Sequence, residues 1–389
     1  MPVPQPTPEA PSPGPAPPSP GVAAGDWRSR LKDAAIDLFG LDLRSLAIMR
    51  MGMGLILIRD LIMRAGDVVA FHSDKGALPR AAILEHQYRT WAVSLHMGVG
   101  HANLQLLLFA LAGVFAVMLT LGYRTRLATV LSWLMLCSVQ SRASIILQSG
   151  DVVLRLMLFW SLFLPLGARF SLDNMLHPPK KLPARSITSV ATGGFILQMG
   201  LIYLFTALLK SGRAWIDGSA VYYALNIDYF AKQPFCRTIV ESRSVMDLIG
   251  PDAVAGLRSL GLIINAKTPW LAAFFTYSTF VWEYTGPVLL LVPFRRVAVR
   301  TFVVCSFIFL HLGFYAGLEI GLFPWICIAG WLGLMPGAFW DRVGLVVAAR
   351  SDRRTWTQRW HVNAMAFFCV LMVVSWNLST IRKQFPKSP

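Results

Sequence analysis

Lys210 ends the apolar run FTALL and opens the polar stretch KSGRAWIDG, which covers residues 210–218. Tyr203, Thr206 and Lys210 recur at spacings of three and four residues, so on a helix they share one face. Two interpretations are open for this lysine. At the end of a membrane helix, a lysine usually extends its ammonium into the headgroup region as an anchor. If burial instead favours the uncharged amine, the same side chain can accept a proton and act as a base.

A second set of proton-carrying side chains lies on another apolar segment. His311, Tyr315 and Glu319 recur every four residues, so a helix would align them along one face. They could relay a proton or stabilise charge if this helix faces the one that carries Lys210. His311 also has a structural interpretation, because a single histidine on an apolar helix is more often a hydrogen-bonded packing residue than a catalyst.

Ionisable residues occur inside other apolar segments, where each costs about 2.5–3.5 kcal/mol on insertion and therefore needs a partner or a task. Asp151 and Arg155 have i, i+4 spacing, which predicts a structural ion pair along one helix. Glu283 lies in the middle of an apolar segment, and its expected partner is an arginine of the first apolar segment, such as Arg50. The other charged residues of that first segment are Arg59, Asp60 and Arg64.

The composition indicates that most of the chain is surrounded by lipid. Of the 389 residues, 55% are hydrophobic and only 14% are charged, whereas soluble domains average about 25% charged residues. The net charge of +16 comes from basic residues between the apolar segments, where they contact lipid headgroups, and no pattern predicts nucleic-acid binding. Four of the five cysteines lie in apolar runs without CxxC spacing, so neither a disulfide framework nor a metal site is expected.

The apolar stretches predict an all-α fold, a polytopic membrane bundle of about nine transmembrane helices, because a spanning helix needs about 20 largely apolar residues. Residues 1–24 hold ten of the 24 prolines, which predicts a disordered tail and not a cleavable signal peptide. The expected helices cover residues 45–64, 103–122, 127–146, 152–168, 191–211, 269–293, 299–317, 320–338 and 361–380.

The distribution of lysine and arginine predicts the orientation in the inner (plasma) membrane. Five basic clusters share one face if the N-terminus is cytoplasmic and the helices alternate in direction. The long segments 65–102 and 212–268 then lie on the periplasmic face, onto which Lys210 opens. The clusters are Arg28 to Arg44, Arg124 with Arg126, Arg169 to Arg185, Arg295 to Arg300, and Arg342 to Arg359.

Five sequence blocks, in order along the chain, resemble the horizontally transferred transmembrane domain (HTTM) family, which includes the vitamin K-dependent gamma-carboxylase. They cover roughly residues 40–340, which leaves 341–389 as a basic cytoplasmic loop, a last helix and a short tail. The blocks are DLRSLAIMRMGMGLILIRDL, FHSDKGALPR, GDVVLRLMLFWSLFLPLGARFSLD, LLKSGRAWIDGSAVYYAL and HLGFYAGLEIGLFPW.

The resemblance implies roles for particular residues. In the carboxylase, a lysine is the base that deprotonates reduced vitamin K. This lysine begins a pattern in which a tryptophan follows after four residues and a glycine after two more. Lys210, Trp215 and Gly218 match that pattern. His311, with Gly321 and Phe323, resembles a later block of the family. Lys210 and His311 are therefore the expected catalytic residues. The expected substrate-binding residues are Tyr203, Thr206, Trp215, Gly218, Tyr315 and Glu319.

Two functions follow from these observations. The first is a carboxylase- or epoxidase-like, quinol-dependent membrane enzyme that acts on a lipid-soluble substrate, with a reduced quinone as the cofactor that the resemblance implies. The second is a non-catalytic transporter or scaffold. The interruption of a helix that is expected near Gly321 and Pro324 would suit a transporter. The stretch LQSGD at 147–151 lacks the histidine that the carboxylase has there, and the chain ends soon after the last helix, so carboxylation of protein glutamates is not expected. No protein partner is indicated.

Overall fold

The computed structural model describes residues 38–86, 94–180, 184–227, 231, 235–260, 262, 265–292, 295–348 and 360–384 of the chain. The side chains of residues 376–384 are outside this description. The segment 1–24, for which the sequence predicts a disordered tail, also lies outside the described residues.

Helices dominate the described part of the chain, which confirms the all-α prediction. Each expected segment contains a helix, and among the described residues three helices, α4, α8 and α15, are long and apolar enough to cross a membrane. The nine helices at the expected positions are α2 (Leu43–Gly66), α4 (Ala102–Leu121), α5 (Thr125–Arg142), α6 (Ser149–Ser161), α8 (Val190–Leu209), α14 (Trp270–Leu289), α15 (Arg296–Gly317), α16 (Phe323–Gly333) and α18 (Trp360–Gln384).

Two of these helices are shorter than the sequence predicts. Helix α6 has 13 residues and α16 has 11, which at about 1.5 Å per residue makes each clearly shorter than a hydrocarbon core of about 30 Å. Helix α6 stops before Pro165, whose ring disfavours helical backbone at the preceding residue. Helix α16 begins only at Phe323 because Gly321 has a positive φ of 62° and Pro324 occupies the first turn.

Short elements connect the long helices. The single sheet of the described residues has two antiparallel strands, β1 (Leu41–Asp42) and β2 (Ser186–Ile187). One π-helical turn, η1 (Val68–His72), follows α2. The remaining short helices are α3 (Arg80–His86), η2 (His96–Gly98), η3 (Ser144–Ile146), η4 (Leu166–Ala168), α7 (Leu172–Leu176), α9 (Arg213–Ile216), α10 (Ala220–Leu225), α11 (Phe235–Val240), α12 (Val245–Ile249), α13 (Pro251–Ser259) and α17 (Gly337–Arg342).

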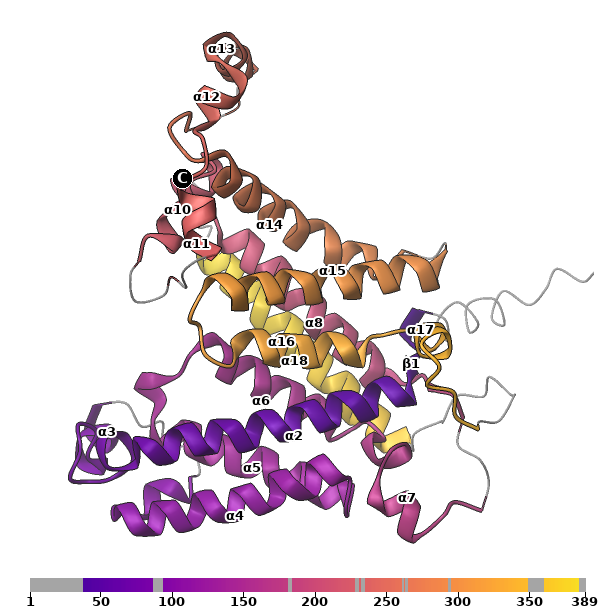
Figure 1. Ribbon diagram of the computed structural model, residues 1–389. Coiled ribbons are helices and arrows are strands. Elements are labelled where there is room, and N and C mark those ends of the chain that lie inside the picture. Colours follow the sequence, from indigo (N-terminus) through magenta and orange to yellow (C-terminus); the bar gives the residue numbers. More distant parts are fainter. Residues whose placement is uncertain are drawn as a thin grey trace, which may run out of the picture.

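The long helices run between two ends of the molecule (Figure 1). At one end lie α3 and the group α10 to α13, which belong to the two long segments 65–102 and 212–268. At the other end lie α7, α17 and β1. The helices α10 and α11 pack on α14, and α12 and α13 extend beyond them. Segments that are far apart in the sequence are thereby collected at the end where α8 stops.

Helix α2 lies at the centre of the packing and contacts both α4 and α16. The crossing with α4 occurs at Gly54, where a Cβ atom would overlap the side chain and backbone of Thr120. Two stacked rings lie in the core: Phe307 of α15 packs on Trp331 of α16, with ring centroids 4.1 Å apart. Both rings are fully buried.

Three arginines near the end that carries β1 are buried, although two of them, Arg44 and Arg300, belong to basic clusters that the sequence predicts at lipid headgroups. Arg300 donates from Nε to the carbonyl of Leu334 at 2.9 Å and from Nη1 to that of Gly40 at 2.9 Å. Arg50 donates to the carbonyl of Phe170 at 2.5 Å. Arg44 binds Asp42 and Asp341. These guanidinium groups satisfy the carbonyls at helix ends and link the termini of neighbouring elements.

Candidate functional site

Lys210 and Glu283 form a buried ion pair between two helices. Lys210 is the residue at which α8 ends, and its Nζ contacts Oε2 of Glu283, which projects from α14. The side chains are 13% and 4% exposed, so the pair is almost fully withdrawn from solvent. The ammonium also lies over the indole ring of Trp215, 4.3 Å from its centroid. A carboxylate and an aromatic face therefore both hold the cation in place.

The expected pairing of Glu283 with an arginine of the first helix is wrong. Helix α14 packs against α8, and this brings Lys210, and not Arg50, to the carboxylate. Arg50, in the first half of α2, instead donates to the carbonyls of Leu166 and Phe170. An ionisable group inside a bundle pairs with the partner that helix packing places beside it, and sequence position does not reveal that choice.

Trp215 contacts the lysine, and Gly218 packs against Tyr277 of α14. Trp215 stacks on Phe280 of α14, with ring centroids 6.4 Å apart and planes inclined by 24°. Gly218 has φ of 83°, and a Cβ atom there would overlap the ring of Tyr277. Tyr277, Phe280 and Glu283 recur every three residues on α14, a signal in the sequence that would have identified this wall of the site.

Thr206 does not join this group. Its hydroxyl donates to the carbonyl of Ile202 at 2.6 Å, and its side chain is exposed on the surface of α8. Such a bond to the residue four positions earlier satisfies the hydroxyl within its own helix. Within the described residues, Thr206 therefore makes no hydrogen bond to the ion pair.

Tyr203 and His311 meet in the core. The Tyr203 hydroxyl and His311 Nε2 are 2.6 Å apart, and Trp331 donates from Nε1 to the same hydroxyl at 2.8 Å. This contact joins α8 to α15, so the two helices do face each other. However, Lys210 lies seven residues beyond Tyr203, and the rise of about 1.5 Å per residue puts it about 10 Å farther along the helix. The structure thus leaves His311 in a buried packing cluster that does not contact the lysine.

The expected line of His311, Tyr315 and Glu319 on one helix is interrupted. Helix α15 ends at Gly317, and the next residue, Leu318, forms an antiparallel bridge with Ala231. Glu319 is therefore outside the helix. Tyr315 remains on α15, where its ring contacts that of Trp325 edge-on at 4.9 Å. The i, i+4 spacing fails because it assumes helical backbone through all three residues.

The expected pair of Asp151 and Arg155 is also wrong. Asp151 lies in the first turn of α6, where its Oδ2 accepts a hydrogen bond from the backbone N–H of Gln148 at 2.8 Å. This capping contact directs the carboxylate toward α2, and its Oδ1 binds Arg64 at 2.5 Å. Arg155 donates instead to the side-chain oxygen of Gln140 at 2.8 Å. Arg64 also binds Asp60, at 2.8 Å, so one guanidinium bridges two carboxylates.

The block FHSDKGALPR forms a tight turn after α2. Asp74 accepts hydrogen bonds from the backbone and side chain of Arg80, at 3.0 and 2.9 Å, which lowers the pKa of its carboxyl group. Its backbone N–H donates to the carbonyl of Gly100 at 2.9 Å. These contacts hold the turn against the start of α4, and His72, two residues before Asp74, is buried.

Comparisons of the chain with protein-family models, with curated proteins and with solved structures found no match. Within the part of the chain that the structure describes, no group of three or more histidine, cysteine, aspartate and glutamate side chains could hold a metal ion.

Proposed function

We propose that this protein is a multi-pass membrane enzyme that removes a proton from a quinol or a related lipid-soluble weak acid, with Lys210 as the base. The observation that carries the proposal is the buried contact of Lys210 with Glu283 and Trp215. The three residues come from different elements and converge at the end of α8. The resemblance of LLKSGRAWIDGSAVYYAL to the carboxylase block supports the same assignment.

The ion pair gives this base a place to store a proton. Lys210 carries an ammonium at rest, and Glu283 is the acceptor in contact with it. When the ammonium passes its proton to the carboxylate, the pair becomes a neutral amine and a carboxylic acid. The amine then takes the proton from a quinol hydroxyl, which leaves a quinolate beside a restored ammonium. One O–H bond of the quinol breaks, one N–H bond forms, and the displaced proton remains on Glu283.

The aromatic side chains fit a ring-shaped substrate. Trp215 and Phe280 lie beside the ammonium, and aromatic side chains attract a further aromatic ring that packs against their edges or exposed faces. Gly218 lets the backbone of the 210–218 segment lie directly against Tyr277. Tyr277 donates to the carbonyl of Ile216 at 3.1 Å, which holds the segment in this position.

An anaerobic experiment with menadiol, a small naphthoquinol, tests the base. The purified protein in nanodiscs should bind menadiol as its anion, seen in the absorbance spectrum, without releasing a matching proton to a pH indicator, because Glu283 retains it. Lys210→Arg should lose this behaviour, since a guanidinium stays protonated and cannot relay a proton. In Lys210→Arg, menadiol should remain protonated or release about one proton per site to the solvent.

The matched control is Lys267→Arg, because Lys267 is exposed in the same long segment. It should behave as the wild type does. If Lys210→Arg also forms the menadiol anion without proton release, Lys210 is not the base. The second candidate function, a transporter or scaffold in which the ion pair only fixes α8 against α14, then takes its place.

We also propose that the nine helices at the expected positions span the membrane, with the N-terminus cytoplasmic and Lys210 at the periplasmic side. The described basic residues beside the start of α5, beside α7 and at the start of α15 favour this orientation, because these elements reach the end of the bundle opposite to the last residue of α8. The shorter helices α6 and α16 would be completed by the segments that follow or precede them, a construction that membrane proteins use where the backbone is covered by protein.

Labelling of introduced cysteines checks the orientation. Ser259 of α13 and Met175 of α7 are both exposed and lie at opposite ends of the bundle. In intact spheroplasts, a membrane-impermeant maleimide should label Ser259→Cys, and it should label Met175→Cys only after lysis. The unmodified protein gives the background from its native cysteines. The reverse pattern would show that the N-terminus is outside and would move the Lys210 site to the cytoplasm.

A further inference from the structure

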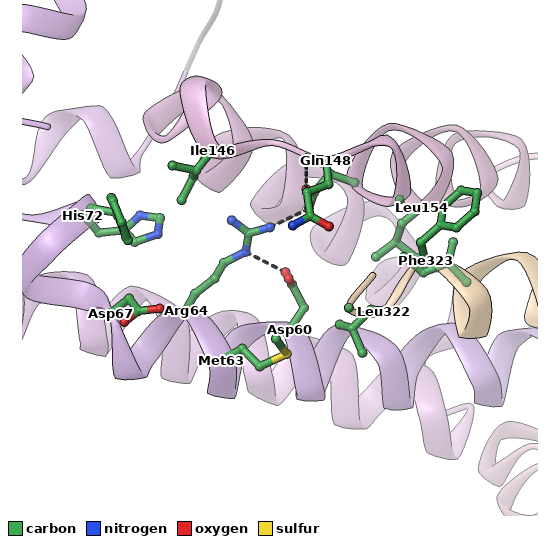
Figure 2. Close-up of a pocket in the computed structure, with 15 residues that line it drawn as sticks. Asp60, Met63, Arg64, Asp67, His72, Ile146, Gln148, Leu154, Leu322 and Phe323 are labelled. Atoms are coloured by element: carbon green, nitrogen blue, oxygen red, sulfur yellow. Dashed lines mark hydrogen bonds and ion pairs between the residues drawn. The ribbon is translucent and has the colours of Figure 1, made fainter. Parts of the chain in front are cut away.

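A separate, partly open cavity lies at the same end of the bundle as α3, lined by α2, η1, α6 and the start of α16. Its volume is about 210 Å³, somewhat larger than the cavity of about 150 Å³ that holds one benzene molecule in an engineered protein. Figure 2 shows Arg64 at its centre, with His72 and Asp67 on one side and Leu154, Leu322 and Phe323 on the other. The cavity therefore has a polar wall and an apolar wall.

The polar wall carries an excess of negative charge. The carboxylates that line the cavity are those of Asp60, Asp67 and Asp151, and the single guanidinium is that of Arg64, which leaves two net negative charges. Arg64 is already engaged by two of these carboxylates. A neighbouring group outside the lining, Arg142 with Asp74 and Arg80, carries one net positive charge, so the whole region remains negative.

An unpartnered histidine also faces this space. His72 is only 1% exposed, and neither of its ring nitrogens has a hydrogen-bond partner in the described residues. Desolvation, with the nearby Arg64, Arg142 and His96, lowers the pKa of His72 to about 3, so the ring is neutral and one nitrogen offers a lone pair. A buried polar group without a partner costs about 1–3 kcal/mol, which a ligand or water in the cavity would recover.

The apolar side chains of the cavity favour a ligand with an apolar group over a bare ion. Phe71, Ile146, Leu154, Leu322, Phe323 and Ile326 line the remaining surface. A small hydrated cation would leave these side chains against water, whereas an apolar group on the cation would cover them. An ammonium offers N–H donors to the acceptors of the polar wall, namely the carboxylate of Asp60, the free nitrogen of His72 and the side-chain oxygen of Gln148.

We propose that this cavity binds an ammonium group carried on an apolar body. The source of that group is either a free amine or the ethanolamine headgroup of a membrane lipid, and both present the same chemistry to Asp60 and His72. The site is distinct from the Lys210 site, because Lys210, Glu283 and Trp215 are not among the residues that line the cavity.

Benzylamine is the probe, tested on the full chain in phosphatidylcholine nanodiscs by calorimetry. Benzyl alcohol keeps the ring without the charge, and benzoate reverses the charge. Benzylamine should bind at least about tenfold more tightly than either, since a charge-assisted hydrogen bond contributes about 1.5–3 kcal/mol. Three results would overturn the proposal: equal binding of benzylamine and benzyl alcohol, tighter binding of benzoate, or no binding of any probe. The last result would indicate a cavity that is filled only by water.

Two variants locate the binding. Ile146→Trp should fill the cavity and abolish benzylamine binding, whereas Ile145→Trp, at an exposed neighbour outside the lining, should leave it unchanged. Asp60→Asn should weaken binding about tenfold by removing one charge. Retained affinity in Ile146→Trp would place the probe elsewhere and refute the site. Nanodiscs that contain phosphatidylethanolamine distinguish the two sources. If the natural ligand is the lipid headgroup, this lipid should compete with benzylamine and weaken its binding. If the natural ligand is a free amine, the lipid should leave benzylamine binding unchanged.

Discussion

Replacing Lys210 with methionine is expected to lower the free energy of unfolding by about 3–5 kcal/mol, the usual effect of leaving one partner of a buried ion pair without the other. The side chain of Glu283 is 4% exposed, and within the described part of the chain Lys210 is its ion-pair partner, so without the lysine it would be left charged in a buried environment or forced to take up a proton. Reversible unfolding in mixed detergent, followed by tryptophan fluorescence, measures the change.

The double variant Lys210→Met/Glu283→Leu should recover most of the lost stability. Two apolar side chains can replace a buried ion pair at little cost, because neither charge then needs to be desolvated. Lys267→Met is the control, and it should change stability by less than about 0.5 kcal/mol since Lys267 is exposed. A Lys210→Met protein as stable as the wild type would show that the pair contributes nothing to the packing of α8 on α14.

The double variant also separates stability from activity. If it folds normally and no longer forms the menadiol anion, the pair has a chemical role in addition to a structural one. If it folds normally and still forms the anion without proton release, the base must be another group. The comparison is informative because both variants remove Lys210 and only one of them leaves an unpaired buried carboxylate.

Arg44→Met is expected to produce a loss of similar size, about 3–5 kcal/mol, at the opposite end of the bundle. Arg44 donates to Asp42 at 3.0 and 2.9 Å and to Asp341 at 2.7 Å. It also donates to the carbonyls of Gly337 and Leu345, at 2.9 and 2.8 Å. The substitution therefore leaves the buried carboxylate of Asp42 without its guanidinium and detaches α17 from the start of α2.

Arg185→Met is the matched control, because Arg185 binds the same Asp341 at 3.5 Å but its side chain is 59% exposed. An exposed ion pair contributes at most about 1 kcal/mol. Urea unfolding in detergent, with the two variants side by side, should separate them by at least about 2 kcal/mol. Equal effects of the two substitutions would mean that Arg44 acts as an ordinary surface charge and that the buried contacts do not stabilise this end.

Much of the fold could be predicted from the sequence because apolar runs and helix boundaries are local properties. Each expected segment contains a helix, and α8 starts at a capping box formed by Ser189 and Thr192. The same local reasoning identifies Lys210 at the end of an apolar run and Trp215 five residues later, whose indole ring lies under the lysine ammonium. Lengths were less predictable, since Pro165 and Gly321 shorten α6 and α16 through backbone restrictions that apolar content does not register.

The pairing of charges could not be predicted in the same way. Spacing of four residues shows that Asp151 and Arg155 can meet, but the capping bond from Gln148 turns the carboxylate toward Arg64 on another helix. Glu283 likewise has the partner that the packing of α14 on α8 provides.

The sequence by itself determined that this chain forms apolar helices, where most of them lie, and that a lysine with a nearby tryptophan ends one of them. The tertiary structure alone decided which carboxylate contacts that lysine, that His311 is enclosed by Tyr203 and Trp331, and that a cavity forms around Arg64. The physical reason is the distance along the chain over which each effect acts. Hydropathy, capping and backbone restrictions act over a few residues, whereas an ion pair or a cavity depends on how helices distant in the sequence rotate and pack against one another.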